Sequence, residues 1–225
     1  MIIAIDGPSG AGKSTLGKML AKRLGLLYLD TGAMYRAVAV AALFSGTDFT
    51  NHEGLTRTAE LAKIDLVGEP DTLHVMLDGR DVTAEIRTLE VAQAASIVST
   101  VSGVRRVMVE HQRQIGLSAA NGCVLEGRDI GSVVFPNADF KFFLTAKPEA
   151  RARRRFEEEK AKGVASSYEQ TLSEINKRDE RDVSRTDSPL VISDDAIVID
   201  TSELDLAEVF DQMVAAINSA KSSSA

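Results

Sequence analysis

The chain contains little of several residue types that mark particular classes of protein. Its 225 residues include one cysteine, three histidines and no tryptophan. Cys123 has no partner for an intrachain disulfide, and its neighbours are apolar, so we expect a small core residue rather than a catalytic thiol. His52, His74 and His111 lie far apart in sequence, without the spacing of metal ligands, which argues against a zinc site.

Long apolar runs are absent as well. No segment approaches the length of a membrane span, and a strand pattern begins at Ile2, which leaves no room for a signal peptide. We therefore expect a cytoplasmic protein that does not bind membranes. No heptad pattern or exposed apolar stripe requires a partner chain, so we expect a monomer.

Net positive charge is also lacking. The formal charge of −7 would repel a polyanion unless a local basic patch overcame it, so a general nucleic-acid binder is disfavoured. Hydrophobic residues make up 44% of the sequence, which is enough for one good core. We predict a single domain over residues 1–225, acting on small molecules.

The most specific motif lies near the N-terminus. Residues 2–6 have the pattern of a buried strand, and a complete phosphate-binding loop follows, made of Gly7, Pro8, Ser9, Gly10, Ala11, Gly12, Lys13, Ser14 and Thr15. Its glycines let backbone N–H groups converge on phosphate oxygens, and the next helix points its positive dipole end at them. Lys13 can reach the outer phosphates, and the Ser14 hydroxyl is placed to ligate Mg²⁺. The alternative, a glycine-rich turn with a chance lysine, does not explain why strand, glycines, Lys-Ser and helix coincide.

Strand and helix patterns alternate along most of the chain. Further strands are predicted at residues 26–30, 123–126, 140–144 and 196–200, with helical stretches between them, including one at 32–44 closed by Gly46. This alternation predicts an α/β fold with a five-stranded parallel sheet flanked by helices. Residues 64–84 break the rhythm, and Asp78-Gly79 is typical of a hairpin turn. We predict a small antiparallel insertion there, which either forms part of a second pocket or is an inert embellishment.

Two groups of arginines come after the third predicted strand of the sheet, and both lie beyond the strand predicted at 140–144. One lies in a highly charged stretch, at Arg151, Arg153, Arg154 and Arg155; the other, at Arg178, Arg181 and Arg185, has spacings of three and four residues that place it along one helical face. Such stretches are usually solvated helices. Transfer of a phosphoryl group between two nucleotides, however, gathers many negative oxygens, which guanidinium groups stabilise well. The region of about 150–185 would then serve as a lid that excludes water.

Residues 176–179 match the Asn-Lys-x-Asp pattern with which GTPases read guanine. That motif should follow a buried strand, whereas the preceding residues 168–175 are amphipathic and helical. The match therefore argues little for a GTP-binding switch.

Five blocks of sequence, in order, closely resemble the bacterial cytidylate kinase family: GPSGAGKS at 7–14, LDTGAMYR at 29–36, EIR at 85–87, EGRDIG at 126–131 and RDERDVSR at 178–185. The resemblance covers nearly the whole chain. It implies a P-loop nucleoside monophosphate kinase fold, with a monophosphate-binding lobe over about 31–100 that carries the insertion. It also implies reversible transfer of the γ-phosphoryl group of ATP to CMP or dCMP, with Mg²⁺. Ser14 stands where some relatives have glycine, so this chain stays close to the standard P-loop.

The resemblance further assigns roles to individual residues. Those similar to nucleoside contacts are Thr31, Ser96, Arg105 and Asp129, and Tyr35 is a further substrate-binding residue. Those similar to ribose contacts are Arg178 and Asp182. Those similar to phosphate-facing and catalytic groups are Lys13, Arg36, Arg128 and Arg185, with Arg154 as a catalytic lid residue near the ATP adenine and phosphates. Cytosine offers an amine donor and two acceptors, which a carboxylate, hydroxyls and an arginine can read. The residues alone also allow simpler roles, in which Asp129 only pairs with Arg128, Thr31 only caps a helix, and Ser96 only fills a helix face.

Two other functions stay open at this point. A P-loop kinase could act on UMP, AMP or a non-nucleotide acceptor, although the block at residues 29–36 argues against it. A GTP-binding switch with weak turnover has only the P-loop and the misplaced Asn-Lys-x-Asp match in its favour.

Overall fold

A computed structural model describes residues 1–161, 163 and 165–223. Its main sheet contains β1 (Ile2–Asp6), β2 (Leu27–Asp30), β6 (Cys123–Glu126), β7 (Phe140–Thr145) and β8 (Ile197–Asp200), in the order β2-β6-β1-β7-β8. Every neighbouring pair is parallel, which confirms the predicted five-stranded sheet. The strand predicted at 26–30 begins one residue later, because the Leu26 N–H is bonded to Ala21 at the end of the preceding helix.

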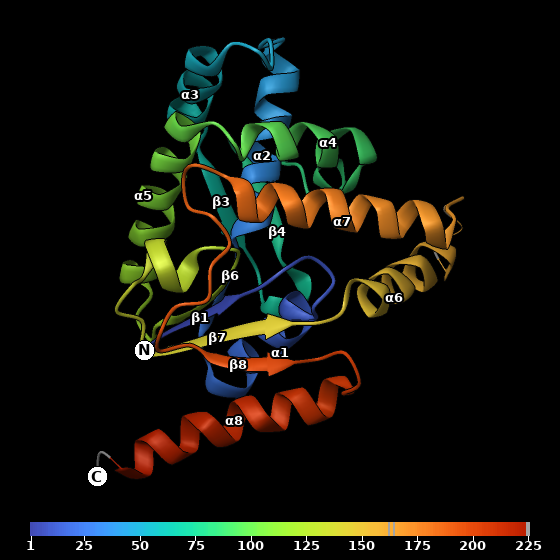
Figure 1. The fold of residues 1–225 in the computed structure, drawn as a ribbon. Helices are drawn as coiled ribbons and strands as arrows, with labels where there is room; N and C mark the ends of the chain where they lie inside the picture. The colour runs from blue at the N-terminus through green and yellow to red at the C-terminus, as the bar shows by residue number, and fades with distance from the viewer. Residues whose placement is uncertain (162, 164, 224–225) are drawn as a thin grey trace.

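Two apolar cores lie on the two faces of this sheet, since successive side chains of a strand point to opposite faces. On one face, Ile3 and Ile5 of β1 pack with α1 (Lys13–Leu24) and α8 (Leu206–Ser223). On the other, Ala4 packs with α2 (Thr31–Ser45), α3 (His52–Leu61), α4 (Leu89–Val98) and α5 (Ser102–Ser118). Figure 1 shows α8 beside β8 at one side of the molecule and α2 to α5 at the other.

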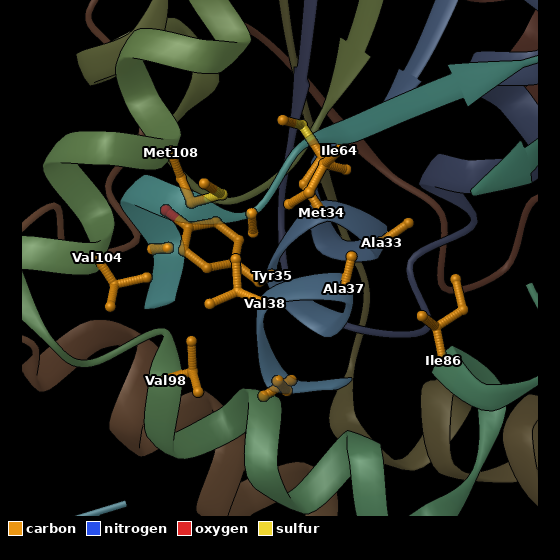
Figure 2. Packing of buried hydrophobic residues seen from close by; sticks show 14 of the residues in the cluster. Ala33, Met34, Tyr35, Ala37, Val38, Ile64, Ile86, Val98, Val104 and Met108 are labelled. Atoms are coloured by element: carbon orange, nitrogen blue, oxygen red, sulfur yellow. The ribbon is translucent and has the colours of Figure 1, made fainter. Parts of the chain in front are cut away.

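Helix α2 passes through the larger core. Its buried residues Tyr35 and Val38 lie near Val98 of α4 and Met108 of α5, whereas Met34 lies beside Ile64, as Figure 2 shows. The side chain of Asp30 caps its N-terminus by accepting the Ala33 N–H at 2.9 Å, and Gly46 in the left-handed conformation ends it. The predicted helix is therefore confirmed, one residue longer at each end.

The insertion is a three-stranded antiparallel sheet of β3 (Ile64–Val67), β4 (His74–Leu77) and β5 (Arg80–Asp81). Asp78 and Gly79 both have positive φ, 51° and 81°, as a tight hairpin turn requires. The predicted antiparallel insertion and its turn are confirmed. A hollow of about 430 Å³ separates residues 68–73 from the α1–β2 turn and the 119–122 loop.

The two arginine groups lie on α6 (Pro148–Ala161) and α7 (Tyr168–Ser184), which pack against each other. A capping box at Ser167 and Gln170 begins α7. Residues 176–179 lie inside this helix, so the Asn-Lys-x-Asp match has no preceding strand. Short helices at Pro70–Thr72, Glu85–Arg87 and Ile130–Val134 complete the fold.

Candidate active site

A cavity of about 250 Å³ opens at the carboxyl ends of β1, β2 and β6, bounded by α2, α4 and α7. This is the edge at which open parallel sheets bind ligands. The sequence-predicted residues that line it are Ser9, Gly10, Lys13, Ser14, Thr31, Tyr35, Arg36, Ser96, Arg105, Arg128, Asp129, Arg178, Asp182 and Arg185. Gly7, Pro8, Ala11, Gly12, Thr15 and Arg154 are not among the lining residues. Segments from five parts of the chain thus meet in one place.

The P-loop lies between β1 and α1 and wraps the first turn of the helix. Gly7 has φ 141°, and a Cβ there would lie 1.9 Å from the Leu144 carbonyl oxygen, so the loop runs against β7 with no space for a side chain. Lys13 is buried and donates to the Pro8 carbonyl at 2.7 Å. Burial, with the nearby charge of Arg128, lowers its pKa. Phosphate oxygens in the cavity would reverse that effect.

An arginine cluster lines the same cavity as the P-loop. Arg128 Nε donates to Asp182 at 2.7 Å, and Arg185 lies 3.9 Å from the same carboxylate. Burial, together with Arg128, lowers the pKa of Arg178 to about 10. Burial alone would raise the pKa of Asp182, but Arg128, Arg178 and Arg185 together outweigh it and lower the pKa. One carboxylate therefore faces three guanidinium groups, which leaves excess positive charge suited to an anion.

A second ion pair lies deeper in the cavity. Arg105 donates to Asp129, and the two side chains are only 4% and 8% exposed. The Arg105 guanidinium lies 5.4 Å from the centroid of the Tyr35 ring, and burial raises the pKa of that phenol to about 12. The alternative that Asp129 pairs only with Arg128 is therefore wrong, because each has a different partner.

The simpler roles of Thr31 and Ser96 also fail. Thr31 does not cap α2, since Asp30 does; its hydroxyl donates to the Glu126 carbonyl at 2.6 Å and so joins the first turn of α2 to β6. Ser96 lies on the cavity side of α4, where its hydroxyl contacts Arg181 of α7. Arg36 pairs with Asp30 at 3.0 Å at the rim.

Arg154 lies elsewhere. Its guanidinium donates to the hydroxyl of Thr201 at 3.1 Å and to the Thr201 carbonyl, and the Thr201 hydroxyl donates to the Ala11 carbonyl at 3.4 Å. It thus lies on the outer side of the P-loop, at the β8–α8 connection. Its neighbour Arg151, which the sequence pattern placed in the charged stretch without a role of its own, is 2% exposed and donates to the Ser9 carbonyl at 3.1 Å.

Two buried carboxylates were also missed. Glu126 ends β6, accepts the Tyr28 hydroxyl at 2.5 Å and is hydrogen-bonded to Ser14. Burial, with the charge of Asp30, raises its pKa. Asp6 ends β1 and accepts the N–H groups of Ile130 and Gly131 at 2.8 and 2.7 Å. Their position in the sequence could have indicated them, because each carboxylate is the last residue of a buried strand and so lies at the ligand-binding edge of the sheet.

The described residues contain no group of three or more histidine, cysteine or carboxylate side chains that could hold a metal ion. A hard cation would need oxygen ligands from phosphates and water together with the Ser14 hydroxyl, and this is how Mg²⁺ binds at P-loops. The site fits such an ion. In the same described part of the chain, no helix has the length and apolarity needed to cross a bilayer.

The parallel sheet, the P-loop between β1 and α1, and the arginine-rich cavity facing it define a phosphotransferase of the P-loop kinase class. A family model described as Cytidylate kinase matches residues 3–219. The Cytidylate kinase of Pelotomaculum thermopropionicum is 47% identical over 220 residues, covering 97% of this chain and 96% of that protein. That of Caldanaerobacter subterraneus subsp. tengcongensis is 49% identical over 215 residues, covering 96% and 93%. The chain belongs to the cytidylate kinase family, as the five sequence blocks predicted.

Among solved structures, an uncharacterised protein from Eubacterium ventriosum aligns over 97% of this chain and 99% of its own, with a TM-score of 0.51. Its sequence identity of 15% limits this likeness to the fold.

Proposed function

We propose that the enzyme transfers the γ-phosphoryl group of ATP reversibly to CMP or dCMP, giving ADP and CDP or dCDP. The observation that carries this proposal is that Lys13 of the P-loop and the Arg128–Asp182–Arg185 cluster line one shared cavity. The P-loop suits a triphosphate, and the arginine cluster suits the phosphate of a second nucleotide. Membership of the cytidylate kinase family supports the choice of acceptor.

Charge stabilisation and alignment account for the chemistry. Lys13 and the P-loop amides hold the outer phosphates of ATP, while Arg36, Arg128 and Arg185 orient the acceptor phosphate. No general base is needed, because the attacking oxygen of the monophosphate is already anionic. As it attacks, the bond from the γ-phosphorus to the β,γ-bridging oxygen breaks and ADP leaves with the electron pair.

The deeper pair supplies the choice of base. The Asp129 carboxylate can accept from the cytosine amine, and Arg105, held against Tyr35, can donate to the ring acceptors. Uracil presents the opposite pattern at the amine position, so it would leave the buried carboxylate without a donor. Thr31 and Ser96 add hydroxyls to the cavity lining, and we assign Arg178 and Asp182, which also line it, to the ribose.

Mg²⁺ is the proposed cofactor. When bound, it would neutralise charge on the transferring phosphates, with the Ser14 hydroxyl as its protein ligand and Glu126 beside that hydroxyl.

The larger organisation follows the same proposal. Residues 31–100, which carry α2, α4 and the insertion, form the monophosphate-binding lobe, and about 150–185 form a lid that excludes water, with Arg154 closing on the ATP side. We propose one domain over residues 1–225 that works as a cytoplasmic monomer and binds neither nucleic acid nor membranes.

The test is ADP production from ATP and Mg²⁺ with CMP, dCMP, UMP, AMP and GMP supplied separately, beside a reaction without acceptor. Turnover should be highest with CMP and dCMP. Preference for another acceptor would contradict the roles given to Asp129 and Arg105 while leaving the kinase class intact. Hydrolysis independent of any acceptor would place the protein with the switch or ATPase P-loop proteins.

A further inference from the structure

We propose that Arg151 is a positioning residue that couples the P-loop to α7, and that it does so through Asp179. The inference deepens the proposed function, because the P-loop is the donor side of the cavity and α7 carries part of the acceptor side. Neither Arg151 nor Asp179 lines that cavity.

The contacts of Arg151 reach three segments that are far apart in sequence. It lies in the first turns of α6, where Nε donates to the Ala146 carbonyl at 2.9 Å, next to the end of β7. Nη1 donates to the Ser9 carbonyl of the P-loop at 3.1 Å. The same Nη1 donates to Asp179 Oδ1 of α7 at 3.1 Å, and Nη2 donates to the other carboxylate oxygen. A planar guanidinium can satisfy all of these acceptors at once, whereas an ammonium group cannot.

Shape as well as charge holds this arrangement. A Cβ added to Gly10 would lie 3.1 Å from Arg151 Cβ, so α6 lies directly against the loop. Asp179 directly follows Arg178 and stands three residues before Asp182, both of which line the cavity. A rotation or shift of α7 that broke the Arg151–Asp179 pair would therefore move the cavity-lining side chains relative to the P-loop.

The consequence concerns alignment rather than affinity. Donor and acceptor phosphates are held by different segments, and an error of about 1 Å between them costs up to roughly a hundredfold in rate. Loss of the coupling should reduce kcat while each substrate still finds its own contacts. If the Arg151–Asp179 pair served only stability, its loss would lower the free energy of unfolding and leave kcat of the folded enzyme unchanged.

The test compares Arg151→Lys, Asp179→Asn and the double variant with the control Arg153→Lys, an exposed arginine of the same helix. Each single variant should lose kcat by about tenfold or more, with KM values for ATP and CMP changed by less than about threefold. The double variant should be no worse than Arg151→Lys, because both changes break one interaction. Asp179→Glu should retain more activity than Asp179→Asn, and Arg153→Lys should match the wild type.

Hydrogen exchange gives a readout that does not depend on the acceptor. In the wild type, ATP should slow amide exchange in both the P-loop and α7. In Arg151→Lys, ATP should slow amide exchange in the P-loop only. Equal protection of α7 in the variant would overturn the proposal, as would kcat values within about twofold of wild type. Failure of the proposed function would be recognised separately, as a wild-type enzyme that does not phosphorylate CMP.

Discussion

At the scale of single residues, the site depends on charges that are held out of water and only partly neutralised. Arg128, Arg178 and Arg185 face the one carboxylate of Asp182, so their remaining positive charge acts on whatever enters the cavity. In a water-poor site such charges act strongly and need little reorganisation during the reaction. Changes to these arginines should therefore affect the rate of phosphoryl transfer more than the affinity for ATP.

Replacement of Arg128 with alanine should lower kcat by about a hundredfold or more while ATP affinity changes little, because a guanidinium aimed at transferring phosphates is worth several kcal/mol. Steady-state kinetics and equilibrium titration with ATP measure the two effects. An unchanged kcat would show that Arg128 does not face the reacting phosphates.

Asp129→Asn should reduce the preference for CMP over UMP, measured as the ratio of kcat/KM values, by about tenfold or more, since an amide can serve either base and a carboxylate only cytosine. Arg36→Lys is the matched control, because a change at a phosphate-facing group should lower both rates and leave the ratio as it is. A ratio unchanged in Asp129→Asn would assign base reading to other residues.

Asp6 should make stability depend on pH in an unusual direction. Burial raises its pKa from the ordinary value near 4 to about 6, although the N–H groups of Gly131 and Ile130 partly offset the rise. The folded state therefore binds the proton more tightly than the unfolded state. The contribution of this group is fully present below pH 4 and is lost as the pH rises to 6, on the order of 3 kcal/mol in total.

Urea unfolding of wild type and Asp6→Asn between pH 4 and 7 checks this prediction. The free energy of unfolding of the wild type should fall relative to that of the variant as the pH rises. Other titrating groups cancel in the difference between the two proteins. A difference that stays constant would mean that Asp6 titrates normally in the folded protein.

At the scale of elements, the P-loop is held by close backbone contact with its neighbours. Gly7→Ala should cost more than about 3 kcal/mol of unfolding free energy, because the added Cβ overlaps the Leu144 carbonyl and the backbone has φ 141°. Gly25→Ala is the control, since Gly25 has φ 66° but open space around it, and should cost only about 1 kcal/mol. An equal loss of unfolding free energy in the two variants would show that β7 shifts to accommodate the added Cβ.

Most elements were predictable because each carries its own local signal. The apolar pattern of β1, the glycines of the P-loop and the Asp78-Gly79 turn specify local conformation wherever the chain goes. The pairing of charged side chains across the cavity has no such local signal in the sequence. Arg105 and Asp129 are 24 residues apart and Arg128 and Asp182 are 54 apart, so nothing in the sequence pattern could tell which carboxylate serves which arginine.

The arginines of α6 show the same limit more sharply. Arg151 and Arg154 lie in one charged run that reads as a solvated helix face, yet Arg151 is buried against the P-loop and Arg154 reaches Thr201. The contacts that the two arginines make depend on where α6 begins after β7, and that position is set by the assembled sheet. Family resemblance assigned Arg154 to the ATP side, and that assignment stays a prediction.

At the scale of the whole molecule, the sheet brings two phosphate sites to one edge while their side chains come from different parts of the chain. The P-loop follows β1, Arg128 follows β6, and α7, which carries Arg178 and Asp182, comes after β7 and α6. Such an arrangement favours direct transfer between two bound nucleotides over transfer to water, since the acceptor occupies the place that water would need.

The most direct measurement follows the γ-phosphate itself. With ATP labelled at the γ-position and CMP present, the label should appear in the β-phosphate of CDP, and release of labelled inorganic phosphate should be slow with or without CMP. Label that appears mainly as inorganic phosphate, at a rate that CMP does not change, would contradict the assignment of the arginine-lined cavity as the acceptor site.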